Sequence, residues 1–83
     1  MKVYIITIED VFDGNSNHTA PIVKKTIEEA RKELDELYEN QKKLYGDSFD
    51  CFEKSENCFE MCEDGYCCQN HYSAVIDEVE IPD

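Results

Sequence analysis

The segment that most constrains the fold of this chain is the stretch from Thr26 to Gly46, TIEEARKELDELYENQKKLYG. Thr26 is a good N-cap, because its hydroxyl can accept a hydrogen bond from a backbone N–H in the first turn. Glu29 can complete a capping box by reaching back to the N–H of Thr26. Apolar residues then recur at helical spacing, at Ile27, Ala30, Leu34, Leu37, Tyr38, Leu44 and Tyr45. The pattern predicts one long helix that ends at Gly46 and packs one face against other segments.

The N-terminal segment predicts the strands on which this helix lies. Lys2 to Phe12, KVYIITIEDVF, is rich in β-branched and aromatic residues, and apolar side chains alternate onto both of its faces. This pattern is typical of a central strand. We expect residues 13–17 to form a turn. Residues 18–24 then return as a second antiparallel strand, which Pro21 restricts to an edge or to a bulge.

The C-terminal half predicts a further pair of strands. Tyr72 to Ile81, YSAVIDEVEI, is a clear strand in which Val75, Val79 and Ile81 share one face. The preceding sequence favours a hairpin around Asp64-Gly65, and a short helix over residues 48–62 is the competing prediction. The expected fold is α+β in the order β-β-α-β-β: a small antiparallel sheet with the first and last strands side by side under the helix.

Length and composition are those of one small domain. The 83 residues form a single expected domain, residues 1–83, with a cysteine-rich acidic insertion at about residues 47–68. No apolar run is long enough to span a bilayer. The apolar start breaks at Glu9-Asp10 without a cleavage site, which indicates a strand and not a signal peptide. We therefore expect a protein of the host cytoplasm, where thiols are reduced.

The formal net charge of −12 is unevenly distributed. Residues 1–25 are neutral overall, the helix contributes −2, residues 47–64 contribute −6 and the last acids contribute −4. Such a field repels nucleic acid and anionic lipid, so direct binding to nucleic acid or to a membrane is not expected. The field would attract a basic surface, although acidity can also serve solubility alone.

The opening MKVYIIT, the Asp/Gly/Asn turn, the capped T-x-E-E-A-R-K helix and the ending YSAVIDEVEI together carry a resemblance. They resemble short acidic strand–helix–strand proteins of bacteriophages and mobile elements. The cysteine-rich stretch 51–68 departs from that pattern. Many phage proteins of this size and acidity inhibit host nucleases or defence complexes, anti-CRISPR proteins among them. The resemblance implies a host protein as partner and carries no site residue with it.

The cysteines and one histidine are the candidate metal ligands. Thiolate and imidazole are the groups that zinc prefers, and four of these groups could form a tetrahedron. Three interpretations stay open: a small zinc-stabilised module, thiols that act as small hydrophobes, and disulfides. The candidate zinc ligands are Cys58, Cys62, Cys67, Cys68 and His71.

The favoured hypothesis is a non-enzymatic protein that binds the basic surface of a nucleic-acid-binding host protein, as a DNA mimic does. No catalytic residue is predicted, because His71 could activate a neighbouring thiol but no orienting acid or oxyanion donor can be identified. Carboxylates would stand in for phosphates, and aromatic rings would anchor the interface. The expected contact residues are the acids of residues 47–64, namely Asp47, Asp50, Glu53, Glu56, Glu60, Glu63 and Asp64, and the acids of residues 77–83, with Phe49, Phe52 and Phe59 as anchors.

Overall fold

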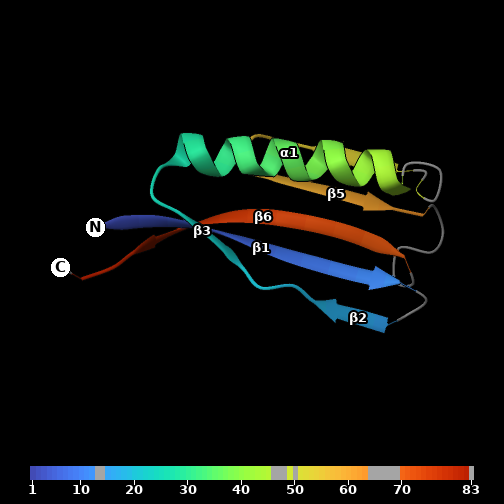
Figure 1. Cartoon of the computed structure of the whole chain (residues 1–83), viewed down its shortest axis with the longest axis horizontal. Helices are drawn as coiled ribbons and strands as arrows, with labels where there is room; N and C mark the ends of the chain where they lie inside the picture. Colours follow the sequence, from blue (N-terminus) through green and yellow to red (C-terminus); the bar gives the residue numbers. More distant parts are fainter. Residues whose placement is uncertain (13–14, 46–48, 50, 64–69, 83) are drawn as a thin grey trace.

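A computed structural model describes residues 1–12, 15–45, 49, 51–63 and 70–82 of the chain. Within these residues the protein is α+β, as predicted: one helix packs against a six-stranded antiparallel sheet (Figure 1). The elements in chain order are β1 (Lys2–Phe12), β2 (Asn15–His18), β3 (Ile22–Lys24), α1 (Ile27–Tyr45), β4 (Cys51–Lys54), β5 (Cys58–Cys62) and β6 (His71–Glu80).

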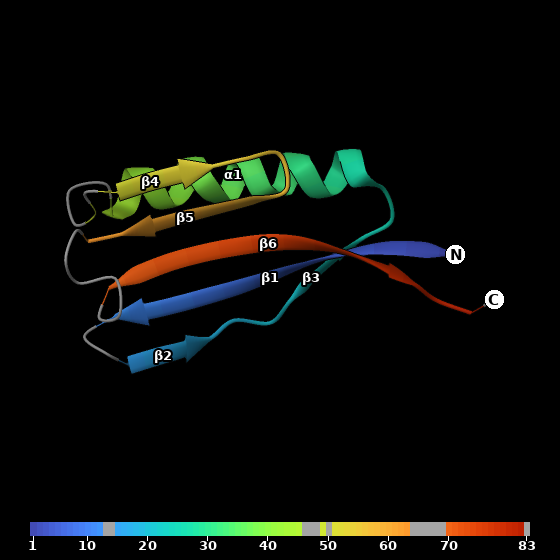
Figure 2. The same ribbon diagram turned by 180° about the vertical axis from the view of Figure 1, so that it is seen from behind.

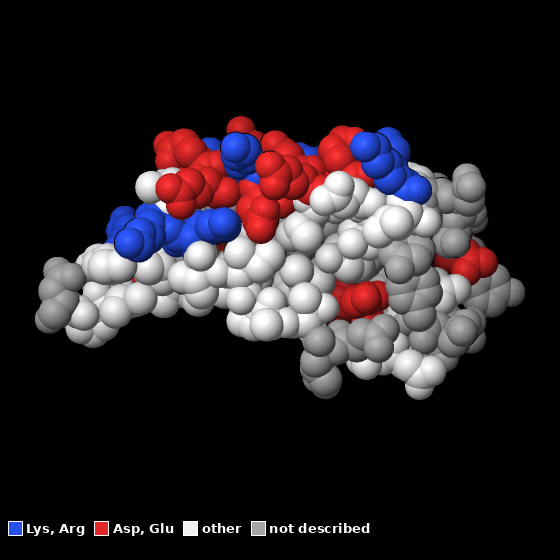
Figure 3. All heavy atoms as spheres, in the orientation of Figure 1, with Lys and Arg blue, Asp and Glu red and all other residues white. Residues whose placement is uncertain are grey.

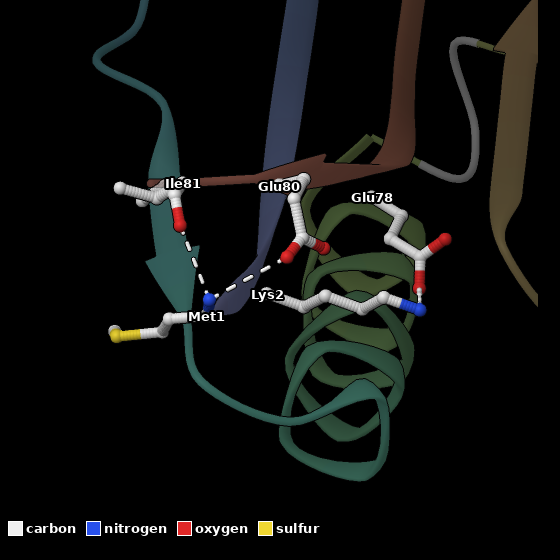
Figure 4. A network of polar contacts seen from close by, with 5 residues as sticks. All are labelled: Met1, Lys2, Glu78, Glu80 and Ile81. Atoms are coloured by element: carbon white, nitrogen blue, oxygen red, sulfur yellow. Dashed lines mark hydrogen bonds and ion pairs between the residues drawn. The ribbon is translucent and has the colours of Figure 1, made fainter. Parts of the chain in front are cut away.

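The first and last strands form the centre of the sheet, which confirms their predicted pairing. The strand order is β2-β1-β6-β5-β4, and β3 also pairs with β1. β1 and β6 are paired from Lys2↔Glu80 to Val11↔His71. At the end of this pair the terminal amine of Met1 donates to the carbonyl of Ile81 over 3.1 Å and lies 3.5 Å from Glu80 Oε1 (Figure 4). Residues from the beginning and the end of the chain are therefore bonded to each other at this end of the sheet.

The predicted return strand is split into two pieces along the same edge of β1. In the pairs between β1 and β2, such as Glu9↔His18, the two residue numbers always add to 27. In the pairs between β1 and β3, such as Ile5↔Val23, the two residue numbers add to 28. The register thus shifts by one residue between the two pieces, where Pro21 lies, and the predicted edge position and irregularity are both confirmed. The predicted turn was too long, because β2 already begins at Asn15.

The helix begins where its capping sequence predicts. The backbone N–H of Glu29 donates to Thr26 Oγ1 over 3.1 Å, and the N–H of Ala30 donates to the carbonyl of Thr26, also over 3.1 Å. The Glu29 carboxylate makes no return bond to the Thr26 N–H, so only half of the predicted capping box forms. α1 ends at Tyr45, and the predicted stop at Gly46 lies outside the described residues.

The core fills the space between α1 and one face of the sheet. Ile6, Leu34 and Met61 are its largest fully buried side chains. Phe59 lies in the middle, with its ring 5.3 Å from that of Tyr38 in an edge-on contact and 5.8 Å from that of Tyr72 in a stacked one. β1, β5 and β6 contribute alternate residues to this layer, and Ile22 of β3 and Phe52 of β4 pack against it. The core cluster comprises Ile6, Ile8, Ala30, Leu34, Phe49, Phe59, Met61, Tyr72, Ala74 and Ile76.

The segment after the helix extends the sheet. β4 and β5 form an antiparallel hairpin from Cys51↔Cys62 to Lys54↔Phe59, and the N–H of Ser55 donates to the carbonyl of Cys58 over 2.8 Å at its turn. The competing prediction of a helix over residues 48–62 was wrong, because long-range pairing with β6 decides the structure here. β5, the first arm of the predicted second hairpin, pairs with β6, while the Asp64-Gly65 turn and most of the predicted second arm, residues 66–72, lie outside the described residues.

Candidate interaction surface

The sheet has a second face that no helix or strand of the described residues covers. The two opposite views place α1 in front of β5 in one and behind β4 and β5 in the other, so the helix lies on one side only (Figures 1 and 2). We call the side away from the helix the open face, on which Val3, Val11 and Cys62 are nevertheless buried. Strand pairing and the alternation of side chains assign these residues to it: Val3, Ile5, Thr7, Glu9, Val11, Val23, Cys51, Glu53, Ser55, Cys58, Glu60, Cys62, His71, Ser73, Val75, Asp77 and Val79.

The open face carries acids and neither lysine nor arginine. Its four carboxylates, Glu9, Glu53, Glu60 and Asp77, are all exposed. The chain has eight lysines and arginines, and all of them lie on the helix, on its side of the sheet, or just before it. They are Lys2, Lys24 and Lys54 on the helix side of the strands, Lys25 before α1, and Arg31, Lys32, Lys42 and Lys43 on α1.

Three of the four open-face acids lie in one row across the sheet. The pairs Glu53↔Glu60, Glu60↔Ser73 and Ser73↔Glu9 place them on β4, β5 and β1. Glu53 and Glu60 form a hydrogen-bonded pair, because they lie two residues in from the hydrogen-bonded Ser55↔Cys58 pair and pair types alternate along an antiparallel ladder. Their Cα atoms are therefore about 5.5 Å apart. Like charges placed directly opposite each other destabilise a sheet.

Cations compensate the acids on the other side of the molecule. Lys54 Nζ lies 2.6 Å from Asp35 Oδ1, and Lys2 Nζ lies 3.5 Å from Glu78 Oε1 (Figure 4). Along α1 the basic and acidic side chains are interspersed (Figure 3). By contrast, Glu53 and Glu60 have no ion pair with any of the described residues. The acids on the helix side are therefore accompanied by bases, whereas those on the open face have no lysine or arginine among them.

Two of the three predicted aromatic anchors, Phe49 and Phe59, are buried core residues, and for these two the prediction was wrong. Phe59 is 2% exposed and Phe49 is 3% exposed, while Phe52 is half-buried against the same core cluster. In β4 and β5 these rings occupy the positions that alternate with Glu53 and Glu60, and they point towards the helix. A small domain needs such large side chains to fill its core, so Phe49 and Phe59 are not free to anchor a partner.

The predicted acidic contact residues do not form one patch. Glu56 lies at the β4–β5 turn, where its Oε2 is 3.4 Å from Arg31 Nη2 of the helix. Glu63 is half-buried and accepts a 2.6 Å hydrogen bond from Asn70 Nδ2. Of the predicted acids, Glu53, Glu60 and Asp77 lie on the open face, whereas Glu78 and Glu80 lie on the helix side. Asp47, Asp50 and Asp64 lie outside the described residues.

One open-face acid, Glu9, was missing from the predicted contact set, while Asp77 belonged to the expected acids of residues 77–83. Glu9 Oε1 lies 3.2 Å from His71 Nε2, and Asp77 pairs with Ile5 on β1. Alternation within the strands shows which residues share a face with these acids, but packing decides which face stays exposed. Each acid occupies the face opposite the most deeply buried positions of its strand, Ile6 and Ala74.

A groove crosses the open face beside Glu53 and Glu60. It has a volume of about 460 Å³ and runs over β4, β5 and β6. Val75, which is 41% exposed, contributes apolar surface to it. The Ser55 hydroxyl lies 3.0 Å from Cys58 Sγ at one end. The open-face side chains along the groove are Glu53, Ser55, Cys58, Glu60, Ser73 and Val75.

The candidate zinc ligands are only partly brought together. Cys58 and Cys62 share the open face but are four strand residues apart, which is about 13 Å and too far for one ion with Zn–S bonds of about 2.3 Å. Cys51, Cys62 and His71 lie in one row across β4, β5 and β6. The described residues contain no group of three side chains that could hold a metal ion, and Cys67 and Cys68 lie outside them.

No helix in the described part of the chain combines the length and the apolarity needed to cross a bilayer. Comparisons of the chain with protein-family models, with curated proteins and with solved structures find no match.

Proposed function

We propose that this chain is a non-enzymatic interaction protein whose open face binds the basic surface of a nucleic-acid-binding host protein. The proposal keeps the partner class expected from the sequence and moves the contact from the aromatic segment to the open face. The resemblance to short phage proteins supports a host protein as partner, and an inhibitor of the DNA-mimic or anti-CRISPR type is the specific form that we propose.

The observation that carries the proposal is the separation of charge by the sheet. Four exposed carboxylates occupy the open face without a lysine or arginine among its described residues. Acids that served only solubility would be expected on both sides alike, with bases interspersed, as they are along α1. A face of one sign attracts an oppositely charged partner over a long range and orients its approach.

The row of acids also supports a partner that ordinarily receives a phosphate backbone. Glu53 and Glu60 are about 5.5 Å apart across their strands, and Glu9 lies two strands beyond Glu60, or about 10 Å away. Negative charges recur about every 3.4 Å along each strand of DNA. Steps of about 5.5 and 10 Å correspond to roughly two and three such intervals, so the carboxylates would take the places of every second or third phosphate in a cationic groove.

The test compares two variants with the same change in charge. The open-face variant carries Glu9→Gln, Glu53→Gln, Glu60→Gln and Asp77→Asn, and the helix variant carries Glu28→Gln, Glu29→Gln, Glu36→Gln and Glu39→Gln. Bacterial proteins captured at low salt by the unaltered chain are identified, purified and titrated with each variant. We expect the open-face variant to bind at least about tenfold more weakly and the helix variant to bind nearly as well as the unaltered chain.

Two readouts decide between inhibition and simple adhesion. The captured protein must release a fluorescent DNA or RNA duplex when this chain is added, and the affinity must fall steeply as sodium chloride is raised. Equal loss of binding in both variants would mean that net charge alone acts, as in a protein made acidic for solubility. If the partner retains its bound duplex when this chain is added, or if binding is insensitive to salt, the proposal that the chain acts as a DNA mimic is refuted.

A further inference from the structure

We propose that the groove beside Glu53 and Glu60 receives an arginine side chain of the partner protein. The inference rests on the proposed function and adds to it the place and the side chain of the central contact. Its occupant is an arginine presented by an exposed segment of a folded protein.

Charge is the first argument. Glu53 and Glu60 face each other directly across β4 and β5, and this arrangement is repulsive. The nearest basic residue in sequence, Lys54, cannot relieve the repulsion, because it points to the helix side and its Nζ is held 2.6 Å from Asp35 Oδ1. Both carboxylates are exposed and make no ion pair with the described residues. A cation supplied by a partner would remove a repulsion that the folded chain leaves unrelieved.

Shape is the second argument. The groove of about 460 Å³ falls within the range of roughly 300–1,000 Å³ typical of ligand sites. Its apolar surface, to which Val75 contributes, can hold the methylene stem of a long side chain. The hydroxyl of Ser55 already lies 3.0 Å from Cys58 Sγ and 3.4 Å from the Cys58 carbonyl. Of the open-face side chains along this groove, the two carboxylates are the ones that carry a negative charge for a cation to pair with.

The spacing of the carboxylates favours arginine over lysine. A guanidinium is planar and presents five N–H donors in a fixed fork, so different edges can reach two separate carboxylates at once. The Cα atoms of Glu53 and Glu60 are about 5.5 Å apart, which leaves room for a flat group between their side chains. An ammonium group is compact and strongly hydrated and would engage the same pair less completely.

The experiment uses three short peptides on the whole chain. Acetyl-Gly-Gly-Arg-Gly-Gly-amide, its lysine analogue and its citrulline analogue, which is a neutral isostere of the arginine peptide, are titrated into ¹⁵N-labelled protein at low salt. We expect the arginine peptide to shift the amide resonances of Ser55, Cys58, Glu60 and Val75. The lysine peptide should bind at least about fivefold more weakly, and the citrulline peptide should cause no shift at these positions.

Matched variants separate a binding role from a structural one. Glu53→Gln with Glu60→Gln should weaken the arginine peptide at least about tenfold and, because the repulsion is removed, should leave the melting temperature equal or higher. Glu28→Gln with Glu36→Gln on the exposed side of the helix should bind it as the unaltered chain does. Equal binding of the citrulline peptide, or an unchanged affinity in the Glu53/Glu60 variant, would overturn the proposal.

The outcomes also distinguish this inference from the proposed function. Arginine-peptide shifts centred on Glu9 and Asp77 would reject the groove but leave the open face as the interaction surface. Absence of open-face shifts with both cationic peptides at millimolar concentration would reject the groove and count against the proposed function as well.

Discussion

Residues of one type have different environments in this protein, depending on the side of the sheet on which they lie. Glu53 and Glu56 are three positions apart, yet Glu53 faces outwards on the open face while Glu56 pairs with Arg31 of the helix. Asp10 is a third case. It pairs with Tyr72 across β1 and β6 and so lies on the helix side, where its Oδ1 is buried without a hydrogen-bond partner. Burial raises the pKa of Asp10 above its ordinary value of 3.8, against the opposing effect of a positive charge on His71.

This raised pKa predicts a pH dependence of stability. The folded state favours the protonated Asp10 carboxyl, so the stability that this proton adds is fully present below pH 3.8 and is lost as the pH rises through the folded-state pKa. Asp10→Asn should therefore unfold at higher urea than the unaltered chain at neutral pH, and the difference should shrink as the pH is lowered. Urea titrations across this range measure both. A variant that is less stable at neutral pH would contradict the prediction.

At the scale of the element, the local sequence decides the helix more firmly than the short strands. Thr26 caps α1 through a 3.1 Å hydrogen bond from the Glu29 N–H, and the acids of the first turn and the lysines of the last complement the helix dipole. The edge pieces β2 and β3 have only four and three residues and depend on β1 for their hydrogen bonds. Their length and register follow from pairing with β1, which the sequence of these short pieces does not specify by itself.

The cap predicts a measurable loss of stability. Thr26→Ala removes the acceptor of the Glu29 N–H and should lower the free energy of unfolding by about 1 kcal/mol. Thr19→Ala, an exposed threonine between β2 and β3, is the matched control and should change it by less than about 0.5 kcal/mol. Chemical denaturation of the two variants measures the difference. Equal effects would mean that the Thr26 hydroxyl does not cap the helix.

At the scale of the whole molecule, a single apolar seam joins the two layers. Ala30 and Leu34 of α1 are both 0% exposed and belong to the same cluster as Ile6, Met61 and Ala74 of the sheet. Because a domain of this size has only one small core, the contact between helix and sheet is also the main source of its stability. The open face lies on the other side of the sheet from this core, so substitutions on it can change binding without disrupting the packing between helix and sheet.

The seam predicts a strong contrast between two leucines of the same helix. Leu34→Ala should leave a cavity between the layers and lower the free energy of unfolding by about 2–5 kcal/mol, a large part of the total for a domain of this size. Leu44→Ala, at a position that is 70% exposed, should cost less than about 1 kcal/mol. Thermal or urea unfolding of both variants checks the contrast. Similar losses would contradict the assignment of the core.

The sequence by itself determined the elements whose signals are local. The capped, periodic stretch after Thr26 predicted α1, and the β-branched runs at both ends predicted β1 and β6 and their pairing, which together define the α+β class. These predictions succeeded because helical periodicity, capping and strand alternation act between residues a few positions apart.

Only the tertiary structure decided which face of each strand the helix covers. β6 offers Tyr72, Ala74 and Ile76 on one face and Val75 and Val79 on the other, and both sets are apolar enough to be buried. The choice of the first face follows from packing against α1, and strand pairing carries it to β5 and β4. It turned Phe52 and Phe59 into core residues and left Glu53 and Glu60 together on the open face. No local pattern contains that choice, because it depends on contacts between segments far apart in the chain.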